Sequence, residues 1–444
     1  MDPVAAARAW LPGRQTVRIG VTGLARSGKT ALLTSLAANL LAAGAGLPTL
    51  PALSTQLAGR SLRVALAPAL ASGVPRFDHA AHLAALAADP PHWPERTDSV
   101  SVLALDIDIS GRGLRALLPP RQLRLELLDY PGEWLLDLPL LSQTFAAWSA
   151  ATWRRMETQA PAAEFMRFVR ALPANAPADE ALARAGHALY RTALRRLRDE
   201  AGLSLLQPGR LLMPAPGPEP PWVELFPMAG EGPLARLLGE RYDAYRAEVR
   251  RALQEPGFGS LDRLLVLADL LTALHQGQAA FDDASAALSA VAQALRARRG
   301  WAWLASLWPA LGGLQRVAFA ASKADHVAER QRGNLAALVG NLALVDGPAT
   351  RAFAIASVRC TEDVVWALDG RPVSAVRGRV AGEARAGRSY PGEVPDTPPD
   401  AAFWMHPFLA LPDFEPLRVP LDGRAGIPHV HLDRLLAFLL EDLL

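Results

Sequence analysis

The feature that most constrains this 444-residue chain is the octapeptide GLARSGKT at residues 23–30, which we call the phosphate loop. It fits the pattern G-x-x-x-x-G-K-[ST]. An apolar run rich in β-branched residues, 16–21, precedes it, and an Ala/Leu-rich stretch beginning at about Lys29 follows it. A strand, a glycine loop and a helix form the context in which such a loop holds phosphate. The sequence therefore predicts a nucleotide site at the end of a buried strand.

Lysine usage points to the same chemistry. Only Lys29 and Lys323 occur, so arginine makes up the other 44 of the 46 Lys and Arg residues. The first lysine lies in the phosphate loop, and the second lies in SKAD, residues 322–325, which resembles the motif that reads guanine in GTPases. Lysine offers a compact ammonium on a flexible stem, which reaches phosphate oxygens that a planar guanidinium would crowd. This usage favours a protein that binds guanine nucleotides.

Each residue of the phosphate loop has an expected role. Lys29 is expected to reach the β and γ oxygens, and the Thr30 hydroxyl to ligate a Mg²⁺ ion that bridges them. Backbone N–H groups of the loop and of the start of its helix are expected to cradle the α and β phosphates. The remaining predicted contacts are Gly23, Ala25, Arg26, Ser27, Gly28 and Ala31.

Two segments are predicted to sense the γ-phosphate. In Asp129-Tyr130-Pro131-Gly132-Glu133, which matches D-x-x-G, Asp129 is expected to hold a magnesium-bound water and Gly132 to offer its N–H. The alternative is a plain turn at a strand end. Thr97 stands where the threonine that senses γ-phosphate and magnesium belongs, and its alternative is an ordinary strand-start residue.

The base is expected to be read after a later strand. The two carboxylate oxygens of Asp325 can accept from guanine N1–H and N2–H₂, whereas adenine lacks the amino group at C2. Ser322 replaces the usual Asn or Thr and can brace the loop, with Lys323 beside it. Backbone N–H groups near Ser357 and Val358 are placed to contact guanine O6.

Strand and helix patterns alternate along the chain, which favours a doubly wound α/β core. Strand-like runs buried on both faces typify a mostly parallel sheet, and helical spacing is strongest in the stretch after the D-x-x-G motif. The expected strands are 99–109, 123–128, 263–271, 316–321 and 351–357, and the expected helices are 141–170, 179–206, 233–253, 279–298 and 327–344. Residues 44–95 show no clean period and predict an irregular or helical connection.

These patterns divide the chain into four parts. We expect 1–140 and 261–358 to form the two halves of a Ras-like P-loop core, 141–260 a large helical insertion, and 359–444 a C-terminal extension packed on the core. Within the extension, Asp-Gly at 369–370 predicts a hairpin, 390–420 is rich in proline, and 432–443 predicts an amphipathic closing helix.

Composition excludes some classes of protein. The net charge is +2 with arginines and acids interspersed, so no nucleic-acid partner is expected. The single cysteine, Cys360, excludes a disulfide framework and fits a reducing cytoplasm, where it is expected to be a buried apolar residue. The N-terminus lacks a secretory signal, and the longest apolar stretch, 31–48, falls short of a spanning helix. Peripheral contact with the inner membrane stays open.

Two other groups of residues invite a functional interpretation. His429 and His431 could present two imidazoles to a metal, but without further ligands a surface strand is the better account. Trp301, Trp303 and Trp308 could anchor the chain at an interface, although core packing before the strand at 316–321 explains them better.

Several motifs together resemble the YcjX-like family of bacterial P-loop GTPases. They are GLARSGKT, WPERTDSVS, LLDYPGEW, RLLVLADLLTALHQGQAAFDD, SKADHV, IASVR, SYPGEVP and PHVHLDRLLAFLL, and they span almost the whole chain. The resemblance implies GTP and GDP binding, Mg²⁺-dependent hydrolysis and a Ras-like core with a helical domain. It also implies a link, in some bacteria, to phage-shock-type envelope stress. The protein partner is unidentified, and a membrane-associated stress protein is one candidate.

Arginine at the position of Arg26 also occurs in the phosphate loops of guanylate-binding proteins and atlastins, which implies a finger acting in cis. Such a finger is positioned by a switch or by a nucleotide-dependent homodimer, and the alternative is a solvated arginine or one paired with Glu133. Glu133 stands where a glutamine would orient the attacking water, and its charge slows the reaction. A slow nucleotide switch is therefore favoured, with two alternatives: a nucleotide-stabilised scaffold without turnover, and an ATP-dependent kinase, which Asp325 disfavours.

Overall fold

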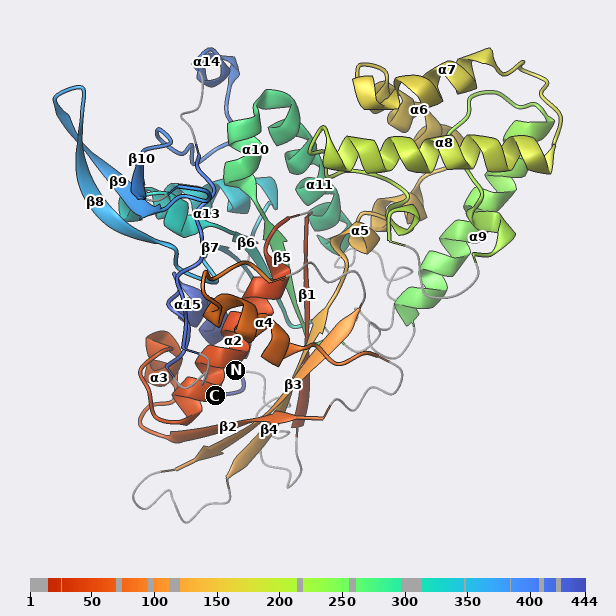
Figure 1. Cartoon of the computed structure of the whole chain (residues 1–444). Helices are drawn as coiled ribbons and strands as arrows, with labels where there is room; N and C mark the ends of the chain where they lie inside the picture. The colour runs from red at the N-terminus through yellow and green to blue at the C-terminus, as the bar shows by residue number, and fades with distance from the viewer. Residues whose placement is uncertain are drawn as a thin grey trace. The chain divides into compact units, whose positions relative to one another are not determined.

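The structure is a computed structural model that describes residues 15–24, 26–68, 74–94, 100–111, 120–213, 219–254, 261–296, 314–346, 349–383, 385–406, 411–420 and 425–444. The chain forms two compact units (Figure 1). The sheet unit comprises Met1–Tyr130, Ser260–Gly277 and Gly313–Leu444, and the helical unit comprises Pro131–Gly259 and Gln278–Gly312. The helical insertion expected at 141–260 lies within the helical unit over most of its length.

The sheet unit is built on one seven-stranded sheet with the order β2-β3-β4-β1-β5-β6-β7. β4, β1, β5, β6 and β7 run parallel, whereas β2 and β3 are antiparallel to their neighbours. The mostly parallel sheet predicted from the sequence is confirmed. The strands are β1 (Gln15–Gly23), β2 (Ser61–Ala67), β3 (Ser101–Ser110), β4 (Arg121–Asp129), β5 (Arg263–Ala268), β6 (Arg316–Ala321) and β7 (Thr350–Ala354).

One large apolar cluster covers a face of this sheet. It joins residues of β1, β3 and β4 to the helices α2 (Lys29–Gly44), α3 (Pro51–Gln56) and α15 (Leu432–Leu440). All six residues of β5 are buried, as expected of a strand packed on both faces. α13 (Arg332–Leu342) packs along β6 and β7. The closing helix predicted at 432–443 is therefore part of the core.

Aromatic side chains form the core of the helical unit. The ring of Trp148 stacks on Tyr242 with centroids 5.0 Å apart and meets the edge of Tyr190 at 6.2 Å. Thr144 and Asp179 accept hydrogen bonds from the first turns of α6 and α8, which fixes where those helices begin. The longer helices are α6 (Phe145–Met156), α7 (Ala163–Ala171), α8 (Glu180–Asp199), α9 (Pro233–Gln254) and α11 (Gln278–Arg296).

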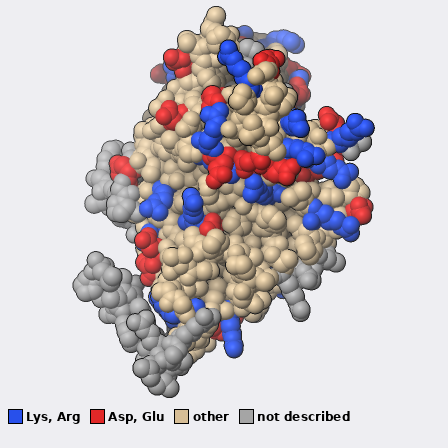
Figure 2. Space-filling view, turned by 90° about the vertical axis from the view of Figure 1, so that its left-hand side faces the viewer, with Lys and Arg blue, Asp and Glu red and all other residues tan. Residues whose placement is uncertain are grey.

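The C-terminal extension carries a second, three-stranded sheet. β8 (Thr361–Leu368) and β9 (Arg371–Arg379) form the long blue hairpin of Figure 1, and β10 (Ala386–Ser389) pairs with β9. The hairpin turns at Asp369 and Gly370, both with positive φ, as the sequence predicted. Ion pairs within this extension include Arg377–Glu362 and Arg379–Glu415. Figure 2 shows acidic and basic groups side by side on the face it presents.

Several sequence expectations for secondary structure were wrong in part. Residues 44–95 contain the edge strand β2 and the helices α3 and α4 (His79–Ala87), because alanines at alternate positions hide the period of β2. The strand expected at 263–271 stops at Ala268, because Asp269 caps α10 (Leu270–Gln276). The helix expected at 327–344 begins at Arg332 after short 3₁₀ turns.

None of the described helices is both long and apolar enough to cross a bilayer. Cys360 is buried as expected, and burial raises the pKa of its thiol.

Arg263, whose side chain is 1 % exposed, binds the C-terminal helix to the sheet. It donates to Leu439 O at 3.0 Å, Asp442 Oδ2 at 2.6 Å and Gln315 Oε1 at 2.5 Å. We predict that Arg263→Ala lowers the free energy of unfolding by about 3 kcal/mol, because buried acceptors lose their donor. Urea unfolding measures this.

The matched control is Arg377→Ala, because Arg377 is paired with Glu362 in solvent, with side-chain exposures of 51 % and 63 %. That change is expected to cost less than about 1 kcal/mol. Equal losses in the two variants would contradict a special contribution from Arg263.

Candidate functional site

The phosphate loop leaves β1 in a tight turn fixed by backbone bonds. Leu24 N donates to Leu267 O at 2.9 Å, and Ser27 N donates to Leu24 O at 3.2 Å. A Cβ at Gly23 would lie 2.6 Å from Leu267 O, so only glycine fits beside β5. Gly28 has φ +84° and directly precedes α2, a conformation that glycine adopts without strain. The expected strand, loop and helix are confirmed.

The start of α2 has neither a side-chain cap nor an acidic residue in its first turn. In the described part of the chain, no acid pairs with the half-buried Lys29. Ser27 is 2 % exposed, and its hydroxyl has no hydrogen-bond partner within the described residues. A helix N-terminus with its dipole, next to an ammonium that has no acid partner among the described residues, is typical of an anion site.

The other predicted residues of this loop lie as follows. Arg26 is exposed with φ 62°, and it contacts no acid among the described residues. Thr30 is half-buried in the first turn of α2, and Ala31 is buried beneath it. Ala25 and Thr97 lie outside the described residues, so both of their predicted roles stay predictions.

Lys323, unlike Lys29, has protein partners. Its Nζ lies 2.7 Å from Asp269 Oδ2 and donates to Thr272 Oγ1 at 3.0 Å. Asp269 also caps α10, accepting from Thr272 N at 3.1 Å. Lys323 therefore links the turn after β6 to the segment that follows β5. Sequence reasoning missed Asp269 and Thr272, although Asp-x-x-Thr after a strand is a recognisable helix start.

Asp325 is 1 % exposed and lies in the turn after β6. Its Oδ2 accepts from Cys360 N at 2.7 Å, and its backbone carbonyl accepts from the Thr361 hydroxyl. The loop after β7 therefore orients the carboxylate and leaves Oδ1 as its other acceptor. Neither Cys360 nor Thr361 was predicted to have this role, because nothing in a sequence places a backbone N–H 35 residues away.

Three more residues of the predicted base-reading region lie near Asp325. Ser322 is 7 % exposed, and its N donates to Ala268 O at 3.0 Å. The side chain of Val358 packs in a buried apolar cluster, which leaves only its backbone for a ligand, and Ser357 is half-buried. His326 packs edge-on against Phe414 at 5.0 Å, and burial lowers its pKa.

The D-x-x-G motif divides between the two units. Asp129 ends β4, is 2 % exposed and pairs in register with Val21 of β1, so it belongs to the sheet unit. Gly132 and Glu133 begin the short helix α5 (Gly132–Leu135) of the helical unit, and Glu133 is 6 % exposed.

The donor set suits Mg²⁺. The described residues contain no cluster of three or more His, Cys, Asp or Glu side chains able to hold a metal alone. Thr30 and Asp129 offer one hydroxyl and one carboxylate, both hard oxygen ligands. Mg²⁺ characteristically takes one or two such ligands and completes its shell with water and substrate phosphates. The residues present therefore fit a nucleotide-bound magnesium ion.

The two histidines do not form a metal site. His429 Nε2 lies 2.9 Å from Thr49 O, whereas His431 Nδ1 lies 3.0 Å from Ala354 O. The expected surface strand was also wrong, because only Val430 bridges to Ala356 and His431 turns into α15 with φ 54°. Trp301, Trp303 and Trp308 lie outside the described residues.

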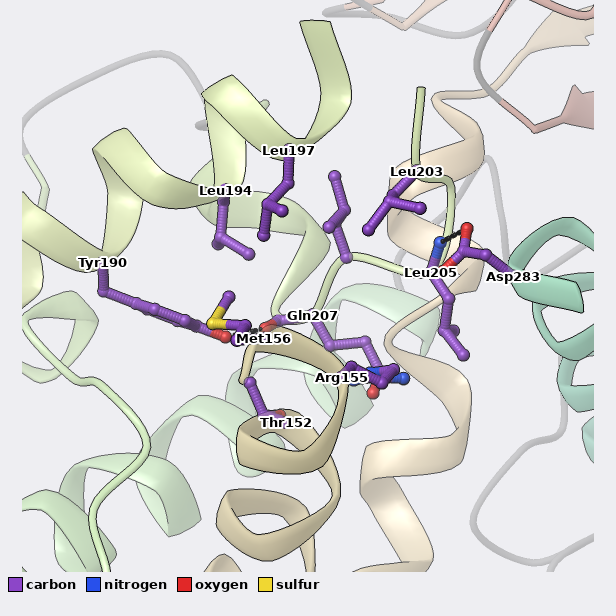
Figure 3. Close-up of a pocket in the computed structure, with 11 residues that line it drawn as sticks. Thr152, Arg155, Met156, Tyr190, Leu194, Leu197, Leu203, Leu205, Gln207 and Asp283 are labelled. Carbon is purple, nitrogen blue, oxygen red and sulfur yellow. Dashed lines mark hydrogen bonds between the residues drawn. The ribbon is translucent and has the colours of Figure 1, made fainter. Parts of the chain in front are cut away.

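A small cavity lies within the helical unit (Figure 3). Five of its eleven lining residues are leucines, and Arg155, Gln207 and Asp283 are its charged and amide groups. Its volume of about 10 Å³ has room for about one water molecule, so it is not a nucleotide site.

These observations define the class of protein. A phosphate loop follows β1, and Asp129 ends β4, which lies beside β1. Asp325 follows β6, which lies two strands from β1 on its other side. This is a P-loop core of the Ras-like type. The chain belongs to the YcjX-like family, whose sequence profile matches residues 17–444.

Two relatives are both described as Ras-like GTPase YcjX. The protein from Escherichia coli (strain K12) is 33 % identical over 450 residues, covering 96 % of this chain and 95 % of its own length. The protein from Shewanella oneidensis is 31 % identical over 464 residues, covering 96 % and 94 %. The match therefore includes both units.

We predict that Asp325→Asn weakens GTP binding by about 2 kcal/mol, because a guanine donor loses its acceptor. The amide oxygen can still accept from Cys360 N, so the Nδ2 group turns to the base and suits the C2 oxygen of xanthosine triphosphate. Calorimetry with both nucleotides measures the preference.

Asp269→Asn is the control, because it weakens the Lys323 contact without changing the predicted base acceptor. It should reduce affinity for both nucleotides alike. An unchanged ratio of GTP to xanthosine triphosphate affinity in Asp325→Asn would contradict the assignment.

Proposed function

We propose that the protein binds GTP and GDP, hydrolyses GTP with Mg²⁺, and acts as a slow nucleotide switch. This proposal depends on Lys29, which is half-buried at an uncapped helix start and has no acid partner among the described residues. An ammonium in that position needs a polyanionic partner, and its loop supplies N–H donors for the same ligand. The printed names of the relatives, Ras-like GTPase, support guanine nucleotide as that ligand.

In this proposal, each residue acts on a defined part of the nucleotide. Lys29 binds the β and γ oxygens, the backbone of residues 25–31 binds the α and β oxygens, and Asp325 selects guanine. Thr30, Asp129 and Thr97 would hold Mg²⁺, which neutralises charge on the phosphates when bound. Gly132 senses the γ-phosphate through its N–H.

Two residues decide the rate in this proposal. Arg26 is exposed and contacts no acid in the described chain, so its guanidinium is available to stabilise charge on the transferring phosphoryl group. Glu133 replaces the glutamine that would orient water, and its charge slows attack. A homodimer formed in the GTP state is one way to position Arg26.

The second candidate function is a scaffold that nucleotide stabilises without turnover. Glu133, an acid only 6 % exposed in the switch motif, favours it. The family resemblance further suggests envelope stress as the context and a membrane-associated protein as partner. Hydrolysis measured beside affinity separates the two functions, because only a switch turns over.

We predict different losses from two neighbouring changes. Lys29→Ala removes a charge from the phosphates and should weaken GTP and GDP binding alike. Thr30→Ala removes a metal ligand and should weaken Mg²⁺-dependent GTP binding and turnover more than GDP binding. Calorimetry with and without Mg²⁺ tests this, and identical losses in all four combinations would count against the proposal.

Arg26→Ala should lower kcat by about tenfold or more and leave GDP affinity nearly unchanged, because the contact forms mainly in the transition state. Single-turnover hydrolysis and GDP titration measure the two quantities. If the rate per molecule rises with protein concentration and Arg26→Ala abolishes the rise, self-association positions the arginine. Small and equal effects on kcat and GDP affinity would refute its catalytic role.

A further inference from the structure

The boundary between the two units runs through the D-x-x-G motif. The sheet unit ends at Tyr130, and the helical unit begins at Pro131. Asp129, the proposed magnesium contact, therefore lies in one unit, whereas Gly132, the proposed γ-phosphate sensor, lies in the other. We call residues 132–137 the switch segment, and its packing lies within the helical unit.

A loop of the helical unit binds the switch segment along its length. Gln207 Nε2 donates to Leu136 O at 2.5 Å, and Trp134 Nε1 donates to Met213 O at 3.2 Å. The guanidinium of Arg210 lies over the Trp134 ring, 4.6 Å from its centroid. Residues 207–213 therefore bind the switch segment at Trp134 and at Leu136.

Gly209 brings this loop into direct contact with Glu133. A Cβ at Gly209 would collide with the carbonyl group of Glu133, so the two backbones touch. Gly209 N also donates to Asp137 Oδ1 at 2.7 Å. One glycine thus contacts the start and the end of the switch segment.

Asp137 joins the switch segment to a third element. Its side chain is fully buried, and its Oδ2 accepts from the Tyr245 hydroxyl of α9 at 2.5 Å. Both carboxylate oxygens therefore have donors, one from the loop and one from a long helix. We call Asp137, Gly209 and Tyr245 the Asp137 clamp.

The loop of the clamp is itself held by two helices. Tyr190 of α8 donates its hydroxyl hydrogen to Gln207 O. Asp283 of α11 accepts from Ser204 N and, as Figure 3 shows, from Leu205 N at 3.0 Å. A displacement of the switch segment would therefore strain the bonds of this loop to α8 and α11 and the bond between Asp137 and Tyr245 of α9.

We propose that the Asp137 clamp positions the switch segment for hydrolysis and makes the helical unit respond to the nucleotide. Loss of the γ-phosphate releases Gly132, and the clamp passes that change to the loop and to α9. The inference rests on the proposed GTPase function and adds Asp137, Gly209 and Tyr245 to it as positioning residues.

The chemistry of the clamp predicts a pH dependence. Burial raises the pKa of Asp137 to about 6, while Tyr245, Gly209 N–H and Arg210 act to lower it. Tyr190 and Tyr242 are the other titratable groups that interact with it. Gly209 N and the Tyr245 hydroxyl both donate to Asp137, so the clamp needs the ionised carboxylate with two acceptor oxygens. Protonation of Asp137 converts one of these acceptors into a donor. Turnover should therefore fall as pH falls through about 6.

The same pKa shift has a defined effect on stability. The folded protein binds the proton more tightly than an unfolded chain with the ordinary value of 3.8. The contribution of Asp137 to the free energy of unfolding therefore falls as pH rises from about 4 to about 6. Asp137→Asn should remove this part of the pH dependence, which urea unfolding across that range measures.

The test compares Tyr245→Phe and Asp137→Asn with Tyr242→Phe in the full chain. Tyr242 is equally buried, but its hydroxyl donates to Leu140 O at 3.3 Å and makes no hydrogen bond to the clamp. Tyr245→Phe should lower kcat about tenfold with GTP affinity within about twofold, because it removes a hydrogen bond to a charged group. Tyr242→Phe should leave both nearly unchanged.

Two further readouts separate positioning from simple destabilisation. The fall of kcat at low pH should move to higher pH in Tyr245→Phe, because that variant loses a donor to the Asp137 carboxylate. The same fall should be absent in Asp137→Asn. Amide exchange in residues 204–213 should differ between a GTP analogue and GDP in the wild type, and this difference should disappear in Tyr245→Phe.

Distinct results would overturn the inference. If the wild type binds and hydrolyses GTP while the clamp variants match Tyr242→Phe in kcat, pH profile and amide exchange, the clamp fails and the proposed function stands. If the wild type binds no nucleotide in calorimetry, the proposed function fails and the clamp fails with it.

Discussion

The carboxyl ends of five neighbouring parallel strands lie at one edge of the sheet, and the nucleotide motifs depend on this arrangement. The phosphate loop follows β1, Asp129 ends β4, and the base-reading turn follows β6. Each motif is short and has little structure of its own, so the strands provide its position. The strands in turn depend on a shared apolar core with α2 and α15. The order of the strands in the sheet therefore decides which of these motifs lie near one another.

The two lysines show how one residue type takes two roles in one site. Lys323 is satisfied by Asp269 and Thr272, so it braces the loop that carries Asp325. Lys29 has no acid partner in the described chain, so it can bind a ligand. A paired ammonium stabilises the fold, whereas an unpaired one at a helix start is stabilised only when an anion arrives.

Local signals allowed much of this to be predicted. The apolar run at 316–321 became β6, the Asp-Gly turn at 369–370 became a hairpin, and the phosphate loop leads into α2. What could not be predicted joins distant residues. Cys360 N–H orients Asp325, and Asp137 meets Tyr245 across 108 residues, contacts that no local period encodes. The edge strand β2 was missed because Ala65 and Ala67 stand at alternate positions and hide the alternation of polar and apolar residues.

Arg263 gives the fold a definite order of completion. Its bonds to Leu439 and Asp442 close the sheet with a helix that follows every nucleotide motif in the chain. During synthesis, the phosphate loop and the base-reading turn leave the ribosome before α15 can cover the core beneath them. The apolar face of the sheet that α15 covers therefore stays exposed until residues 432–440 pack on it, and we expect a chain truncated before them to be a substrate for chaperones and proteases.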